Sequence, residues 1–588
     1  MSAYSLKEEP ERHRRPPQRE MHSAHSALAP TSTAAGSHAC DLEPTMRTLT
    51  SAALATTVAL GLTLIAAVPA RASTGDGPTL RELAEPAGLT IGSGSIKAAE
   101  WTKDDRPSNY LTDPRFADTL AEQFNGLSPE NEMKWAFTQP EEGVYDFAGL
   151  DRLVAFAEEH DMAVKGHGLI SSCCDPEYVT SITDAGEMRA AMTEHFTTVM
   201  ERYDGRIDRW DVVSEALESQ GTTLQSTTFF KVLGPGYIAD AFRIARAADP
   251  DAKLFINENL VEFDAAKRQA FLDLLTGLVA EGVPVDGVAL QMHETFAGPL
   301  PGVITEMVDS YRALGLDVEI AELDVHTYDP VSQATIYGDV VAEALAAGVT
   351  EISTWGFTDK HLYTWLPGAK PLIFDEEYGP KPAYFAVRDA LQQFVTPTAA
   401  PGVASLSNTG RKSGLSDGDY DIKMNLTKGA PGSYYRLYEN DVLVSSQRLD
   451  SLATPRQSAT TSFSGKAEGK YRYRAELINS QGVTSTKTTT VLVKHLAPSR
   501  PVVSVDNRDG DGTFVATATL KSGINATSYA FKLDGRIVGT GPLTAATPNK
   551  QTAKVSLTGI AAGRHALTAV FTNTKGSTES RSVTVRVR

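Results

Sequence analysis

Two glutamates stand directly after short apolar runs of the sequence. Glu215 follows Trp210-Asp-Val-Val-Ser, and Glu322 follows Val318-Glu-Ile-Ala. If these runs are strands of one parallel sheet, both carboxyl groups lie at the same edge of that sheet. One carboxyl group of such a pair can protonate the leaving oxygen of a glycosidic bond, while the other attacks the anomeric carbon or activates water there. The pair therefore predicts acid–base and nucleophilic chemistry on a sugar.

Other polar side chains recur at the ends of similar apolar runs. They are Glu130, Asn131, His167, Ser214, Asn257, Glu258, Gln291, His293, Asp324, Trp355 and Asp359. The alternative for any single glutamate among them is a solvated loop residue, and the alternative for His293 is a satisfied core histidine. Their occurrence in register with Glu215 and Glu322 favours a shared binding site.

The elements that must position these residues are eight apolar runs that alternate with amphipathic helical stretches between residues 80 and 394. The runs are 89–91, 124–127, 162–166, 207–213, 253–257, 287–291, 317–321 and 351–355. Strands that alternate with helices predict a parallel sheet, and eight units in about 300 residues are typical of a closed (β/α)₈ barrel. The alternative is an open doubly wound sheet, but no glycine-rich phosphate motif follows the first run.

The composition and the apolar pattern of the sequence change after Phe394. Residues 395–403 are a Pro- and Ala-rich linker, and the segments 404–496 and 497–588 repeat each other with a period of roughly 95 residues. Short alternating segments between turn residues predict two β-sandwich modules of immunoglobulin or fibronectin type. All five tryptophans precede this region, so we interpret the modules as spacers or weak binders.

The N-terminus has the features of a processing signal. Residues 1–45 are polar, and an apolar run from about Leu54 to Val68 ends in Ala70-Arg71-Ala72. A basic start, an apolar stretch and a small-residue cleavage site predict a signal peptide at 46–72, with Met46 as the true start and an extracellular mature chain. A membrane anchor is the alternative, but the run is shorter than the roughly 20 residues that span a bilayer.

Charge and cysteine content narrow the possible partners. The net charge of −18 disfavours nucleic acid and anionic membranes and leaves a neutral sugar open. Cys173 and Cys174 are the cysteines that follow the signal peptide, and we expect two free thiols, with a vicinal disulfide as the alternative. No metal-ligand spacing is evident, so we expect neither metal nor cofactor.

Several long motifs closely resemble glycoside hydrolase family 10. They are Phe124-Asn-Gly-Leu-Ser-Pro-Glu130-Asn-Glu-Met-Lys134-Trp135, Trp210-Asp-Val-Val-Ser-Glu215-Ala, Gln291-Met-His293, Glu322-Leu-Asp324-Val, Trp355-Gly-Phe-Thr-Asp359 and Pro371-Leu-Ile-Phe-Asp-Glu-Glu-Tyr-Gly-Pro-Lys-Pro-Ala383. The resemblance covers about residues 80 to 394.

This resemblance implies a retaining β-glycosidase, with Glu215 as acid/base, protonated at rest, and Glu322 as nucleophile. It implies that His293 orients the nucleophile and that Asp324 holds the imidazole. Sugar hydroxyls would bind to Glu130, Asn131, Lys134, His167 and Gln291, and the wall under the sugar would be formed by Trp355 and Trp365.

The sequence departs from the family pattern within the site itself. Ser171 and Ser172 stand where the xylanases carry a Trp-His pair, Ser214 replaces an Asn, and Asn259-Leu260 replaces Tyr-Asn. The lost bulk makes room for a hexose, and Leu260 suits an apolar aglycone. This combination resembles the tomatinase branch, which removes the oligosaccharide from α-tomatine. An endo-1,4-β-xylanase is the alternative.

Two other classes remain as rivals. A catalytically inactive carbohydrate-binding protein would have lost a carboxylate, and both are present, although Ser214 keeps that reading open. An adhesion or scaffold role rests only on residues 404–588. We expect a monomer whose partner is a carbohydrate or glycoside.

Overall fold

The computed structural model of the chain describes residues 77–94, 106–410, 415–453 and 456–588. The predicted extension 1–45, the signal peptide 46–72 and Trp101 lie outside the described residues. Among the residues that are described, none of the helices is long and apolar enough to cross a bilayer.

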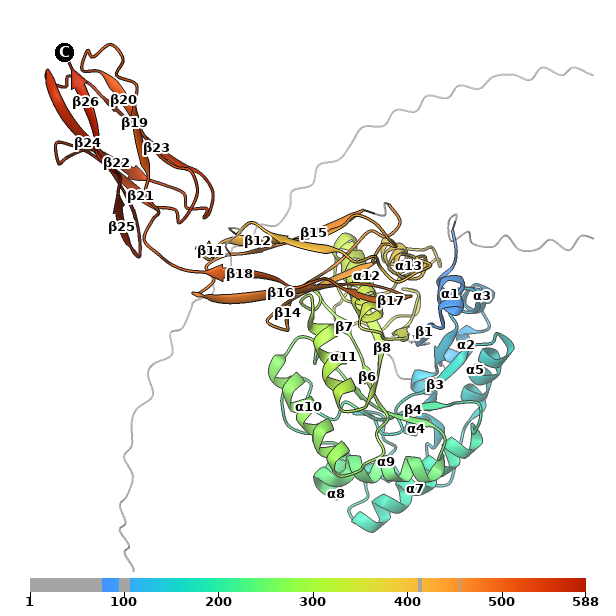
Figure 1. Cartoon of the computed structure of the whole chain (residues 1–588). Coiled ribbons are helices and arrows are strands. Elements are labelled where there is room, and N and C mark those ends of the chain that lie inside the picture. Colours follow the sequence, from blue (N-terminus) through green and yellow to red (C-terminus); the bar gives the residue numbers. More distant parts are fainter. Residues whose placement is uncertain (1–76, 95–105, 411–414, 454–455) are drawn as a thin grey trace, which may run out of the picture. The chain divides into compact units, whose positions relative to one another are not determined.

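Eight parallel strands close into a barrel (Figure 1). They are β1 (Thr90–Gly94), β2 (Gly126–Ser128), β3 (Ala163–Gly166), β4 (Arg209–Ser214), β5 (Lys253–Glu258), β6 (Gly287–Leu290), β8 (Asp317–Val325) and β9 (Glu351–Thr354). Each strand pairs with the next in this order, and β9 returns to β1, for example through Ile352 opposite Ile91. A two-residue strand, β7 (His293–Glu294), pairs with the end of β8. The sequence prediction of a (β/α)₈ barrel is confirmed.

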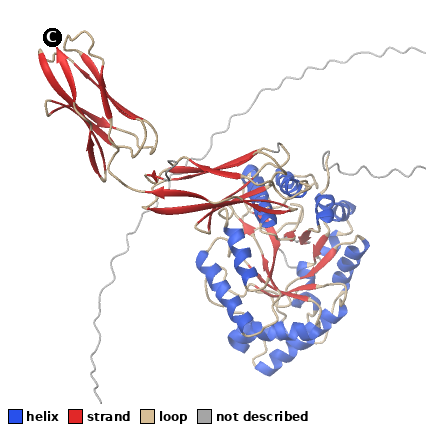
Figure 2. Cartoon of the chain, in the orientation of Figure 1, coloured by secondary structure: helices blue, strands red, loops and turns tan. Residues whose placement is uncertain are grey.

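Helices form the outer layer around these strands (Figure 2). They are α1 (Leu80–Ala84), α2 (Pro107–Tyr110), α3 (Pro114–Gln123), α4 (Trp135–Thr138), α5 (Ala148–Glu159), α6 (Glu177–Thr180), α7 (Ala185–Arg202), α8 (Thr228–Leu233), α9 (Tyr237–Ala248), α10 (Ala265–Ala280), α11 (Val303–Ala313), α12 (Pro330–Ala346) and α13 (Pro382–Val395), with 3₁₀ turns η1 (Glu85–Ala87), η2 (Glu130–Met133) and η3 (Gly234–Gly236). Aspartates begin the long helices: the carboxylates of Asp184 and Asp264 accept hydrogen bonds from the first-turn amides of α7 and α10.

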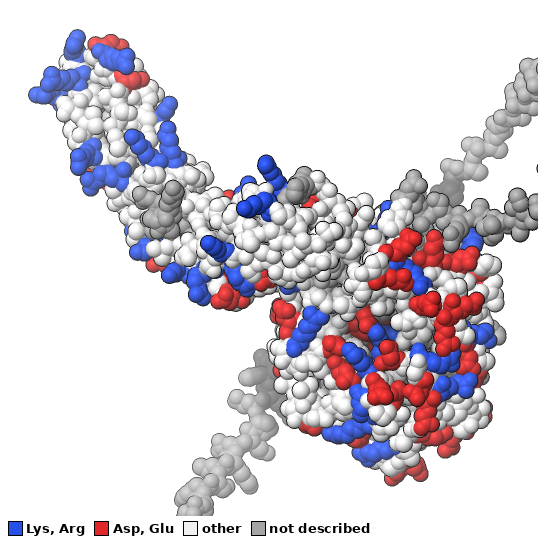
Figure 3. Space-filling model, turned by 45° about the vertical axis from the view of Figure 1, so that its right-hand side comes forward, with Lys and Arg blue, Asp and Glu red and all other residues white. Residues whose placement is uncertain are grey.

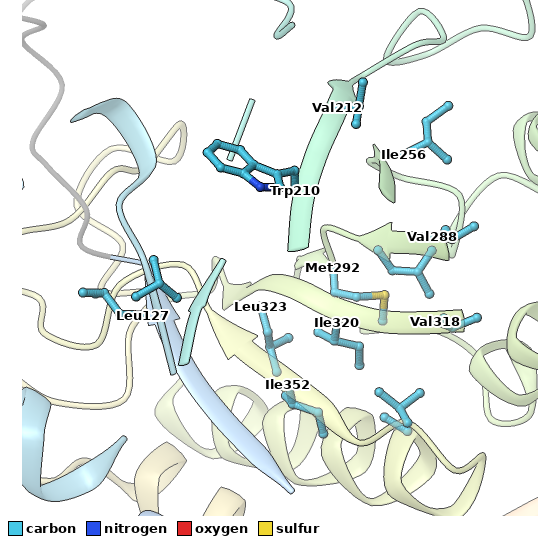
Figure 4. Close-up of a cluster of buried hydrophobic side chains, with 14 of the residues drawn as sticks. Leu127, Trp210, Val212, Ile256, Val288, Met292, Val318, Ile320, Leu323 and Ile352 are labelled. Atoms are coloured by element: carbon cyan, nitrogen blue, oxygen red, sulfur yellow. The ribbon is translucent and has the colours of Figure 1, made fainter. Parts of the chain in front are cut away.

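The apolar core lies between the strands and this helical layer. Val212, Ile256, Val288, Val318, Ile320 and Ile352 are among its strand side chains (Figure 4). Trp210 is fully buried on β4 beside Gly166 of β3, where any Cβ would stand 2.3 Å from the indole ring. The close approach of these two strands therefore requires glycine at position 166.

Two β-rich modules follow the barrel. The first contains β10 (Ser405–Asn408), β11 (Leu415–Ser416), β12 (Tyr420–Leu426), β13 (Tyr434–Glu439), β14 (Val442–Arg448), β15 (Gln457–Phe463), β16 (Gly469–Asn479), β17 (Gly482–Ser485) and β18 (Thr489–Val493). The second contains β19 (Val502–Val505), β20 (Phe514–Leu520), β21 (Ser528–Leu533), β22 (Arg536–Pro542), β23 (Gln551–Leu557), β24 (Gly563–Asn573), β25 (Gly576–Glu579) and β26 (Val583–Val587).

Each module combines a three-stranded sheet with a larger, mainly antiparallel sheet over its own apolar core, as β-sandwiches do. The strands β16 and β24 begin 94 residues apart, at Gly469 and Gly563, which agrees with the predicted repeat.

Charge is divided unequally between the barrel and the modules. Residues 80–394 carry 23 Lys and Arg against 53 Asp and Glu, whereas residues 404–588 carry 25 against 13. Figure 3 shows acidic side chains over the barrel and mainly basic ones over the C-terminal module. The net charge of the whole chain therefore conceals two parts of opposite sign.

Candidate active site

The two predicted catalytic glutamates line one cavity of about 300 Å³. Glu215 is the first residue after β4 and has a φ of +59°, and its amide donates to the Asn257 carbonyl oxygen at 2.8 Å. Glu322 lies within β8, and its side chain is buried. Glu215 therefore stands at the carboxyl end of β4, and Glu322 stands just beyond the residues of β8 that pair with β6, although β8 itself continues to Val325.

A chain of amide side chains connects the two carboxylates. Gln291 Nε2 donates to Glu215 Oε1 at 3.3 Å and to Asn257 Oδ1 at 2.8 Å. Asn257 Nδ2 in turn donates to Glu322 Oε1 at 2.7 Å. Ser214 Oγ donates to Asn257 Oδ1 at 3.3 Å. We did not predict Asn257 as a substrate-binding residue. Its position at the end of β5 was the feature of the sequence that pointed to the site.

His293 bridges the nucleophile and a second carboxylate. Its Nδ1 lies 3.0 Å from Asp324 Oδ1, and its Nε2 lies 3.3 Å from Glu322 Oε2. Burial lowers the pKa of His293, but the charges of Asp324 and Glu322 outweigh burial and hold it well above its ordinary value. For Glu322, burial acts in the opposite direction and raises the pKa. The hydrogen bond from His293 and the charge of the neighbouring His167 outweigh burial, so the pKa of Glu322 lies below its usual range. Glu322 is therefore held as an anion.

Charged side chains form the floor of the site inside the barrel. His167 Nδ1 lies 3.0 Å from Asp211 Oδ2, and Lys165 Nζ lies 3.2 Å from Asp211 Oδ2 and 3.2 Å from Glu319 Oε1. Burial raises the pKa of Asp211, but the charge of Lys165 and the bond to His167 keep it below its ordinary value. Our sequence reasoning missed Asp211 and Lys165, although Lys165 is the single charge of β3 and Asp211 lies among apolar residues of β4.

The remaining wall of the cavity comes from loops that follow β2, β3 and β9. Its residues are Glu130, Asn131, Lys134, His167, Ser171, Ser172, Cys173, Trp355 and Tyr363. Glu130 has a φ of +54°, and burial raises its pKa to about 8, against the charge of Lys134. Glu130 is therefore a neutral hydrogen-bonding group at neutral pH. Tyr363 was not predicted, because no periodic pattern marks its loop.

Three predicted binding residues are not among those that line this cavity. The amide oxygen of Asn259 accepts a hydrogen bond from Lys267 Nζ at 2.6 Å, and Lys267 also pairs with Glu258 at 2.9 Å. Leu260 follows with a φ of +56°. Trp365 is half exposed, and its ring lies 4.8 Å from that of His326. The buried Lys267 of α10, which sequence position could not reveal, is what holds the Asn259 side chain.

Cys173 and Cys174 form a disulfide, which corrects our expectation of two free thiols. Their Cα atoms lie 3.7 Å apart, and Cys174 has a φ of +71°. This left-handed turn is the local conformation that brings adjacent side chains together, and residue types alone do not reveal it.

Two clusters have the residue types of metal ligands. They are His293, Asp324 and His326, and His167, Asp211 and Glu322, with candidate ligand atoms within 4.8 Å of one another in each set. Contacts between the imidazole nitrogens and the carboxylates account for both arrangements.

Comparisons with known proteins agree with this geometry. The profile described as "Glycosyl hydrolase family 10" matches residues 80–390. A relative named "Endo-1,4-beta-xylanase B" from Thermotoga neapolitana is 34% identical over 293 residues, which are 47% of this chain and 84% of the relative. A "Beta-1,4-xylanase" from Dictyoglomus thermophilum is 32% identical over 302 residues, 47% of this chain and 85% of the relative.

Solved structures show the same likeness. Native xylanase 10B from Thermotoga maritima is 34% identical, with a TM-score of 0.50, covering 54% of this chain and 99% of that one. Xylanase 10B from Thermotoga petrophila RKU-1, solved with xylobiose, is 33% identical, with a TM-score of 0.50, covering 55% of this chain and 99% of that one. Both likenesses span about half of this chain.

Proposed function

Because the chain belongs to glycosyl hydrolase family 10, a family of retaining glycosidases, we propose that it hydrolyses plant β-1,4-xylan. The observation that carries this proposal is the pair Glu215 and Glu322 in one cavity, connected through two amide side chains. The relatives at 32–34% identity are named xylanases, which favours xylan over other β-glycosides.

In the first step, Glu322 attacks the anomeric carbon while Glu215 transfers its proton to the leaving oxygen. The C–O bond to the leaving group breaks, and an ester bond forms between Glu322 and the sugar. The hydrogen bonds that Asn257 and His293 direct at Glu322 hold one oxygen each, so the nucleophile is oriented before substrate arrives.

In the second step, Glu215 removes a proton from water, and the water oxygen attacks the anomeric carbon. The ester bond breaks, Glu322 leaves as a carboxylate, and Glu215 regains its proton. The protonated His293, held by Asp324, stabilises the returning charge on Glu322. Two inversions give net retention of configuration.

One observation favours a second candidate, the oligosaccharide of a steroidal glycoalkaloid such as α-tomatine. Ser171 and Ser172 line the cavity with small side chains at the positions where the xylanases carry a Trp-His pair. The removed bulk suits a hexose with its hydroxymethyl arm better than it suits xylose. This observation bears on the sugar that is bound and leaves the chemistry unchanged.

A direct comparison of two substrates tests these alternatives. The assays measure reducing ends from xylan and oligosaccharide release from α-tomatine, with Glu322→Gln as the matched inactive control. The first proposal is supported if the native chain hydrolyses xylan and Glu322→Gln does not. If the native chain cleaves α-tomatine and does not hydrolyse xylan, the second candidate replaces the first. Turnover by Glu322→Gln equal to that of the native chain would refute both.

We also propose that the mature chain is extracellular, as the apolar run before Ala70-Arg71-Ala72 predicts. Mass spectrometry of protein recovered from culture medium tests this. An N-terminus near Ser73 is expected, and retention of residues 46–72 would contradict it.

A further inference from the structure

The loop after β3 supplies one wall of the catalytic cavity. Three consecutive residues of this loop, Ser171, Ser172 and Cys173, line the cavity beside Lys134 and Glu215. Both serines are small and polar, so the sulfur of Cys173 is the largest soft, apolar group that this wall presents. Trp355 and Tyr363 are the aromatic residues among the others that line the cavity.

The backbone holds the disulfide firmly in this place. Ser171 Oγ donates to the Cys173 carbonyl oxygen at 2.7 Å, and the Ala136 amide donates to the Cys174 carbonyl oxygen at 2.9 Å. Lys134 Nζ lies 4.0 Å from Cys173 Sγ. Because the bond joins adjacent residues, it closes a small ring that includes the peptide between them and restricts both side chains.

We propose that the Cys173–Cys174 disulfide is a substrate-contacting surface of the cavity, and that its reduction weakens substrate binding. Sugar pockets combine apolar contact for the C–H faces of the ring with a few polar groups for the hydroxyls. Glu130, Asn131 and Lys134 supply polar groups here, and the disulfide supplies a rigid apolar contact next to them. This inference rests on the glycosidase function proposed above, and it names a redox control of that site.

A dithiol reduces this bond by two exchange steps. A reductant thiolate attacks one sulfur, the Cys173–Cys174 bond breaks, and a mixed disulfide forms while the other cysteine leaves as a thiolate. The second thiolate of the reductant then attacks the reductant sulfur of the mixed disulfide. The bond to the cysteine breaks, that cysteine leaves as a thiolate, and the reductant becomes a cyclic disulfide. Two electrons pass from the dithiol to the protein, and both cysteines end as thiols after protonation.

Reduction changes the wall in two ways. The ring opens, so each cysteine side chain is free to take its own rotamer and the turn at Cys174 is no longer fixed by a covalent bond. Cys173 also becomes an ionisable thiol close to the Lys134 ammonium, which favours a thiolate where the sugar needs apolar contact. Both changes act on binding, because Glu322 is positioned by β8, and the hydrogen bond by which this loop meets β4, from the Ser214 amide to the Ile170 carbonyl oxygen, lies outside the disulfide ring.

The test compares the oxidised full-length chain with the same protein after treatment with dithiothreitol. Intact mass, showing a gain of two hydrogen atoms, verifies reduction. Initial rates on an aryl β-xyloside or aryl β-galactoside, whichever is turned over, give kcat and KM. We expect KM to rise about tenfold or more on reduction, with kcat within about twofold, and reoxidation by oxidised glutathione to restore KM.

The double variant Cys173→Ser/Cys174→Ser is the matched control. It should show the higher KM and should not respond to dithiothreitol. An unchanged KM after verified reduction overturns the proposal, as does an equal response of the double variant to dithiothreitol. If the double variant fails to fold, the reduced native chain decides alone.

Substrate identity does not enter this outcome, since any hydrolysed aryl glycoside serves. If neither an aryl glycoside nor xylan nor α-tomatine is hydrolysed, the proposed function fails, and the affinity of oxidised and reduced protein for xylobiose, measured by calorimetry, decides about the disulfide separately. Equal affinity in the two states then refutes the contact.

Discussion

Replacing Asn257 by Ala tests whether the amide chain sets the charge state of the nucleophile. Asn257 Nδ2 donates to Glu322 Oε1 at 2.7 Å and lies 3.1 Å from Asp211 Oδ2, and its Oδ1 accepts from Gln291. The variant removes a donor from a buried anion and leaves Gln291 without one acceptor.

The size of the effect follows from the hydrogen bond to Glu322. A hydrogen bond to a charged group contributes about 1.5–3 kcal/mol, and each pKa unit corresponds to about 1.36 kcal/mol. The pKa of Glu322, now held below its usual range, should therefore rise in the variant, because the buried anion loses a donor. We expect kcat/KM at neutral pH to fall about 10- to 100-fold through loss of positioning.

The assay is kcat/KM on an aryl glycoside as a function of pH, because the acid limb reports the free enzyme's essential base. Ser214→Ala is the comparator, since it removes the 3.3 Å hydrogen bond to Asn257 Oδ1 and leaves the bond from Asn257 to Glu322 in place, and it should cost less than Asn257→Ala, about threefold. Circular dichroism must show both variants folded. An acid limb that stays in place in Asn257→Ala, with kcat/KM within about threefold of the native value, would refute the reasoning.

Three further outcomes follow from the site and the fold. Glu215→Ala should lower kcat on poor leaving groups by about 10²–10⁴, while azide restores turnover of an activated aryl glycoside and yields the β-glycosyl azide; a rate without azide dependence would contradict its acid/base role. Burial raises the pKa of Glu262 to about 7, so folding stability should be full below about pH 4.5 and fall as pH rises through 7, by about 3 kcal/mol. Urea unfolding near pH 5 and pH 8 should show this loss, and Glu262→Gln should reduce it. Deletion of 497–588 should leave kcat/KM on soluble substrates within about twofold, because that module has its own core, whereas Tyr434 and Ile478 of the preceding module belong to the core of the barrel; a loss above tenfold would refute that independence.

The barrel was predictable because buried parallel strands are short apolar runs, and Glu215 and Glu322 because they directly follow or lie within such runs. The network around them was harder to predict. Asn257 and Asp211 acquire their roles from partners on other strands, and sequence distance says nothing about those contacts. Asn259 does not line the cavity for the converse reason, since its side chain has a partner that the sequence position does not reveal, a lysine from α10.

The disulfide shows a second limit on what can be predicted from the sequence. Adjacent cysteines bridge only when the chain turns between them, and the φ of +71° at Cys174 is a property of the folded loop. The sequence showed that Ser171 and Ser172 are smaller than the residues they replace. It did not show that the sulfur of Cys173 lines the cavity next to them.

The two reacting carboxylates and the short loop after β3 come from different parts of this barrel. The two reacting carboxylates are fixed by β4 and β8, whereas Ser171, Ser172 and Cys173 belong to one short loop. If this loop selects the sugar, as proposed above, substitutions at Ser171 and Ser172 change which glycoside is accepted while β4 and β8 keep the two carboxylates in place. Exchanging residues 171–174 between family members therefore tests how much of the preference belongs to this loop.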